Sequence, residues 1–76
     1  MNNARRKTIE AIVNELQDFD ARIEAVQQEE QEAADMMSEN FPESERTEAA
    51  EEAASELDNA HTAIQEATTA LETAMA

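Results

Sequence analysis

The feature that most constrains this chain is a repeat of apolar residues at seven-residue intervals. In the first half, apolar residues follow one another at alternating steps of three and four, the spacing that places side chains along one stripe of an α-helix. They form an a row and, three residues further along, a d row. The a row is Ile9, Leu16, Ile23 and Met37, interrupted by Glu30, and the d row is Ile12, Phe19, Val26 and Ala33. Val13 widens the stripe, and the pattern predicts a long helix over residues 4–37.

The second half carries the same repeat with smaller residues. Its a row is Ala50, Leu57, Ile64 and Leu71, and its d row consists only of alanines: Ala53, Ala60, Ala67 and Ala74. Beside them runs a further alanine row of Ala49, Ala63 and Ala70. The repeat predicts a straight helix over residues 44–75, and its broad small-residue face favours contact with more than one neighbouring helix.

A turn is expected between the two heptad runs, over residues 38–44. Pro42 cannot continue a helix interior and disfavours helix at the residue before it, while Asn40 and Ser44 are both suitable N-cap residues. Each helix would extend roughly 50 Å. Two helices of equal length joined by a short turn form an antiparallel hairpin, so we expect an all-α, coiled-coil-like single domain over residues 1–76.

A lone hairpin of this size would have a thin core. We therefore expect a homodimer that forms a four-helix bundle, or completion by another protein; a marginally stable monomer is the alternative. High net charge with few aromatic residues is also typical of disorder, but the heptads argue against that reading. The expected oligomer seam is Ile9, Ile12, Leu16, Phe19, Ile23, Val26, Leu57, Ala60, Ile64, Ala67 and Leu71.

Charge and composition exclude several functions. Nineteen acids against five Lys or Arg give a net charge of −14, which disfavours direct binding to nucleic acid or anionic membranes. The chain has no Cys and no Gly, so disulfides, thiol chemistry and phosphate-binding glycine loops are not expected. No apolar run is long enough for a signal peptide or a membrane span, and a cytoplasmic location follows as the expectation.

No catalytic or metal-binding constellation is evident, so we expect no enzyme activity, no metal and no cofactor. The spacing Asp58-x-x-His61 occurs in di-iron helical bundles. In this heptad register, however, His61 would lie beside the seam and Asp58 would face outward. The alternative interpretation of His61 as a partly exposed structural residue is therefore favoured over a metal ligand.

The acidic residues concentrate toward the predicted turn. Over a rod of roughly 50 Å they give about one acid per 2.6 Å, and about one per 1.3 Å in a dimer, values that bracket the ~1.7 Å charge spacing of duplex DNA. We therefore expect a DNA-mimicking face that binds a protein with a basic surface; the alternative is a structural module whose charge only provides solubility. The predicted partner-binding acids are Glu29, Glu32, Asp35, Glu45, Glu48, Glu51, Glu52 and Glu56.

The chain resembles small acidic helical proteins of tailed phages and prophages in the run from Glu29 through Arg46, in the alanine- and glutamate-rich heptads after it, and in the basic start at residues 5–7. This resemblance implies a small phage product acting in the cytoplasm of a bacterial host. Such products include acidic inhibitors of host defence, anti-CRISPR proteins among them. The resemblance implies no particular functional residues.

Overall fold

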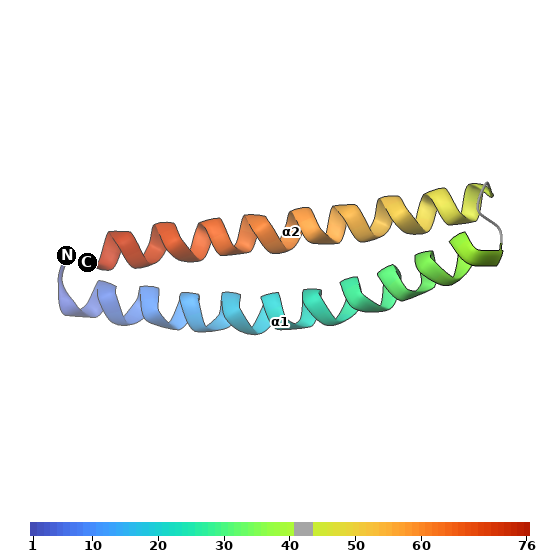
Figure 1. Cartoon of the computed structure of the whole chain (residues 1–76). Helices are drawn as coiled ribbons and strands as arrows, with labels where there is room; N and C mark the ends of the chain where they lie inside the picture. The colour runs from blue at the N-terminus through green and yellow to red at the C-terminus, as the bar shows by residue number, and fades with distance from the viewer. Residues whose placement is uncertain (41–43) are drawn as a thin grey trace.

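The protein is a hairpin of two long antiparallel helices. The computed structural model describes residues 1–40 and 44–76 and contains α1, Asn3–Asn40, and α2, Glu45–Met75. The helices lie side by side in a rod 56 Å long, 15 Å wide and 13 Å deep (Figure 1). We call the end of the rod where both termini lie the open end, and the other the turn end. This architecture confirms the predicted all-α hairpin.

Polar side chains satisfy the backbone at both ends of α1. The Asn2 side chain accepts a hydrogen bond from the backbone N–H of Arg5 at 2.8 Å, which is N-cap geometry. At the other end, the Asn40 amide donates to the carbonyl of Met36 at 2.9 Å. The prediction that the turn begins at residue 38 is therefore wrong, because residues 38–40 are helical and Asn40 ends α1 rather than starting α2. Residues 41–43 of that predicted turn lie outside the described residues.

Ser44 is the N-cap of α2. The sequence offers both Asn40 and Ser44 as N-cap residues. The Ser44 backbone is extended, at φ −82° and ψ 152°, and its hydroxyl accepts a hydrogen bond from the backbone N–H of Thr47 at 3.1 Å. The hydroxyl oxygens of Ser44 and Thr47 lie 2.8 Å apart. Glu45 and Glu48 stand in the first turn of α2, where negative charge is favourable for the helix dipole. Ser44 thus fixes the point at which the second helix begins.

The seam between the helices uses the predicted a rows but not the large residues of the predicted d row in α1. In both helices the second row facing the partner helix lies four residues after a, rather than three. In α1 that row contains Val13, Asp20, Gln27 and Ala34, and in α2 it contains Thr47, Ala54, His61 and Thr68; all of them are buried or half-buried. By contrast, Ile12, Phe19 and Val26 are 40%, 49% and 47% exposed.

Each helix is thus rotated about its own axis relative to the predicted register, so that the row at a+4 faces the partner helix in place of the row at a+3. Side-chain size and polarity explain this rotation. Ala34, Ala50 and Ala54 are 1%, 8% and 2% exposed, so near the turn end the seam closes on small side chains that allow close approach. Further along the rod, Asp20 and Gln27 each form a polar contact with α2 from the same side of the seam. The large apolar residues of the a rows therefore lie in the contact, whereas the large d-row residues of α1 stay exposed.

The hairpin has a thin core. The buried apolar side chains among the described residues are Val13 and the three alanines near the turn end. The chain exposes 5662 Å². A folded monomer of 8.4 kDa typically exposes about 4,600 Å². The rod therefore leaves about 1,000 Å² more surface in water than a typical globular protein of its mass.

Candidate protein interaction surfaces

The predicted partner-binding acids are all exposed, but they do not form one face. They are distributed around both helices in the half of the rod near the turn end, on the outer sides as well as on the flanks. Two of them take part in hydrogen bonds within a helix, Asp35 with Gln31 at 3.0 Å and Glu56 with Asn59 at 3.4 Å. The eight acids, which together we call the acidic surface, therefore lie on several sides of this half of the rod, and their role in partner binding stays a prediction.

These acids are not neutralised by neighbouring cations. Across residues 1–40 and 44–76, no Lys or Arg lies within 4 Å of a carboxylate, and the one ion pair joins Asp20 to His61. Arg5, Arg6 and Lys7 lie together at the start of α1, at the open end. Charge is therefore distributed unevenly along the rod, with the cationic cluster at one end and unpaired carboxylates toward the other.

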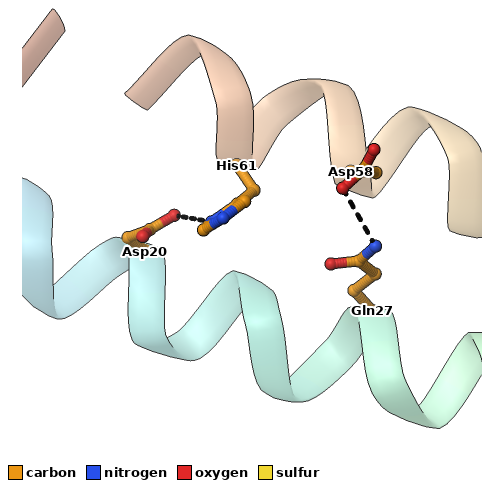
Figure 2. Close-up of polar contacts among 4 residues, drawn as sticks. All are labelled: Asp20, Gln27, Asp58 and His61. Carbon is orange, nitrogen blue, oxygen red and sulfur yellow. Dashed lines mark hydrogen bonds and ion pairs between the residues drawn. The ribbon is translucent and has the colours of Figure 1, made fainter. Parts of the chain in front are cut away.

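Two polar contacts join the helices near the middle of the rod (Figure 2). Asp20 Oδ1 and His61 Nδ1 lie 2.5 Å apart, and Gln27 Nε2 donates to Asp58 Oδ1 at 3.3 Å. The His61 and Asp20 side chains are both 19% exposed, so this pair is largely shielded from water. Asp58 thus contacts α1 rather than facing only solvent, and His61 lies on the seam rather than beside it.

Asp58 and His61, the pair in the Asp58-x-x-His61 spacing, point to different places on α1. The two side chains contact different residues of α1, seven positions apart, and do not converge on a common point (Figure 2). Within the described part of the chain, no three His, Asp or Glu side chains are arranged to hold a metal ion. The spacing serves inter-helix contacts in this fold.

Asp20 raises the pKa of His61 above its ordinary value of 6.5. The main cause is the hydrogen bond to the Asp20 carboxylate, supported by the negative charges of Asp20, Glu24 and Asp58 and opposed by partial desolvation of the ring. The protonated imidazole therefore stabilises the folded hairpin. Because the pKa is raised in the folded state, this contribution is fully present below pH 6.5 and is lost as the pH rises through the folded-state pKa.

We expect an NMR titration of the His61 ring to give a pKa above 6.5, and the Asp20→Asn variant to bring it down toward that value, because the strongest partner is lost. Glu24→Gln is the matched control: it also removes one negative charge, but it leaves the hydrogen bond in place and should lower the pKa less. An unchanged His61 pKa in Asp20→Asn would show that the inter-helix pair does not form in solution.

The second candidate surface is apolar and lies on the side of the seam away from Asp20 and His61. We call it the apolar flank: the predicted d rows, which are Ile12, Phe19, Val26 and Ala33 of α1 with Ala53, Ala60, Ala67 and Ala74 of α2. None of these positions is charged. An open groove of about 460 Å³ runs along it, lined by Phe19, Arg22, Ile23, Val26, Leu57 and Ile64. The Arg22 guanidinium lies 5.8 Å from the Phe19 ring centre, at cation–π distance.

The predicted oligomer seam is thereby divided between two places. Ile9, Leu16, Ile23, Leu57, Ile64 and Leu71 are half-buried between the two helices of one chain. Ile12, Phe19, Val26 and Ala67 lie on the apolar flank and are exposed, and Ala60 on the same flank is half-buried. Glu30, on the a row, is half-buried near the turn end. Whether the apolar flank joins two chains stays a prediction.

Comparison with known proteins gives no relative: no family model, no curated protein and no solved structure matches this chain. In the described residues, neither helix is long and apolar enough to cross a membrane. The acidic surface and the apolar flank are therefore the features of the chain that bear on its function.

Sequence reasoning missed the Asp20–His61 and Gln27–Asp58 contacts. The signal was available in the antiparallel pairing, which brings residues near 20 opposite residues near 61 and residues near 27 opposite residues near 58. The heptad register assigned large apolar residues to the seam. It placed His61 beside the seam and Asp58 on the outside, so a contact of either residue with the other helix was not expected.

Proposed function

We propose that this protein is a non-enzymatic binding module whose acidic surface occupies the basic, nucleic-acid-binding surface of another protein. It would act as a homodimer in which two hairpins form a four-helix bundle. The observation that carries the proposal is the set of exposed carboxylates with no Lys or Arg within ion-pair distance in the described residues. Unpaired surface charge of one sign raises the rate and specificity of association with an oppositely charged surface.

The spacing of the acids along the rod supports a DNA-like surface. Nineteen acids along 56 Å give about one per 2.9 Å. Two chains side by side give about one per 1.5 Å, close to the ~1.7 Å of duplex DNA. The acids of a dimer therefore have a charge density similar to that of the DNA phosphate backbone. A partner protein with a basic surface would meet this negative charge density on binding.

The resemblance to small acidic proteins of tailed phages favours a particular partner. In that setting, the partner is a host protein that binds nucleic acid, such as a component of a defence system, and the chain acts as its inhibitor in the host cytoplasm. The acids at the turn end are the residues proposed to contact it.

A second candidate function is structural assembly, and the half-exposed Ile12, Phe19 and Val26 favour it. In that case the apolar flank carries the function and the charge only keeps the protein in solution. The two functions differ in what binding depends on: salt and carboxylates for the acidic surface, apolar side chains for assembly.

The experiment is affinity capture from bacterial lysate at two salt concentrations, followed by affinity measurement with the captured protein. We expect binding to weaken steeply with salt. Changing Glu48, Glu51, Glu52 and Glu56 to Gln should weaken it about thirtyfold, if each exposed ion pair contributes ~0.5 kcal/mol. A matched variant removes four exposed acids nearer the open end: Glu10→Gln, Asp18→Asn, Glu66→Gln and Glu72→Gln.

Both variants lose the same net charge, so the comparison separates position from overall charge. The proposal expects the turn-end variant to lose more affinity than the open-end variant. Equal and small losses, together with binding that does not respond to salt, would favour the assembly function instead.

A further inference from the structure

We propose that the apolar flank binds the same flank of a second copy of this chain, with the open end of one hairpin over the turn end of the other. The inference rests on the homodimer of the proposed function and specifies its surface and its orientation. It does not depend on which basic protein the acidic surface binds.

The apolar flank has the composition of a helix-packing surface. Ile12, Phe19 and Val26 lie seven residues apart and stay 40%, 49% and 47% exposed. On α2, alanines at matching intervals allow close approach of a neighbouring helix backbone. In a four-helix bundle, each hairpin has one face that packs against the other hairpin. When that hairpin is absent, this face exposes a row of large apolar residues beside a row of small ones.

The whole face of the rod that carries the apolar flank, polar margins included, has enough area for a stable dimer. One face of a rod 56 Å by 15 Å covers about 800 Å², which equals the area that each partner typically buries in a specific interface. It is also close to the surface excess of about 1,000 Å² that the isolated hairpin exposes relative to a typical monomer. Pairing through one face would bring the exposed surface per chain back to the usual range.

The charge distribution selects the orientation. Arg5, Arg6 and Lys7 lie at the open end, whereas unpaired acids predominate toward the turn end. If the open end of one hairpin lies over the turn end of its copy, each cationic cluster lies beside acids of the partner. If both hairpins point the same way, cations face cations and acids face acids, which is unfavourable at low salt.

The position of the apolar flank allows complete overlap in that orientation. Its α1 row runs from Ile12 to Ala33. The centre of this row lies about 29 Å from the start of α1, at 1.5 Å per residue. This is the middle of the 56 Å rod. A twofold axis through that point, perpendicular to the rod, superimposes the two apolar rows and leaves no end overhanging.

The test is a distance between spin labels on two copies of the free protein. The chain has no Cys, so Ala4→Cys provides a single labelling site near the open end, on the exposed side of α1. The proposed dimer places the two labels roughly 55 Å apart, at 1.5 Å per residue on either side of the axis. Hairpins that point the same way would place them within about 30 Å, the width of a bundle plus the labels.

A long distance that disappears when unlabelled protein is mixed in excess supports the proposal, because the signal then arises between chains. A distance under about 30 Å overturns the orientation. The absence of any inter-chain distance, with a monomeric mass at the same concentration, overturns the interface. Because no partner is present in the experiment, failure here is distinguishable from failure of the acidic surface to bind its target.

Discussion

Replacing Phe19 with Asp is expected to convert the dimer into monomers, with a dissociation constant raised about a thousandfold. The twofold symmetry doubles the effect, because each dimer loses two aromatic side chains at ~2 kcal/mol each, and two carboxylates enter an apolar contact. Within one chain, however, Phe19 is already 49% exposed. The variant should therefore keep its helices, and the measurement is sedimentation equilibrium together with far-ultraviolet circular dichroism.

Ala25→Asp is the matched control for this variant. It adds the same charge to the same helix, but position 25 is exposed and lies outside both the seam and the apolar flank. The control should remain dimeric. If Phe19→Asp dimerises as tightly as the control, the apolar flank is not the interface, whatever holds the two chains together.

Replacing Ala54 with Leu is expected to lower the free energy of unfolding by about 1–3 kcal/mol, the usual cost of overpacking a filled contact. Ala54 is 2% exposed and lies in the seam near the turn end, together with Ala34 and Ala50. A larger side chain there has to move the helices apart. In a chain of this size the melting temperature should fall by roughly 10 °C, measured at one protein concentration because dimerisation contributes to stability.

Ala11→Leu serves as its control. Ala11 is exposed on α1, and Ala and Leu have similar helix propensities, so this change should leave the melting temperature nearly unchanged. Equal melting temperatures for the two variants would mean that the helices are not in close contact at Ala54.

Much of the fold could be predicted from the heptad spacing. The a rows and the two helices follow from local periodicity, which depends on backbone geometry and needs no knowledge of the partner helix. The antiparallel arrangement follows from the equal lengths of the helices and the short connection between them. The end of α1 was harder to predict, because the restriction imposed by Pro42 acts on the residue before it and left Ser38 and Asn40 free to be helical. Ser44 was identifiable because its hydroxyl can accept from a backbone N–H three residues later.

The rotation of the helices about their axes could not be predicted in the same way. Val13 and Ile12 are both apolar neighbours of the a row, so the pattern does not decide which of them faces α2. That decision depends on the close approach of Ala34 and Ala54 and on contacts between distant residues such as Asp20 and His61. The close approach and the polar contacts are tertiary properties. They involve small or polar residues, which apolar periodicity does not identify as contact positions.

The candidate site was predictable in composition but not in shape. The exposure of the eight predicted acids follows from their polar character alone. Their arrangement around the rod depends on the seam register, so the side of the rod on which each acid lies could not be predicted. The division of the predicted oligomer seam into an internal seam and an apolar flank has the same origin.

The central claim, that the acidic surface takes the place of nucleic acid on a basic protein, is tested most directly by displacement of a DNA duplex from the captured partner. With fluorescently labelled duplex bound to that partner, the account predicts release as this chain is added, at lower concentrations for the wild type than for the turn-end variant with four acids changed to Gln. Binding of the chain to a complex that keeps its duplex, at any chain concentration, would contradict the account.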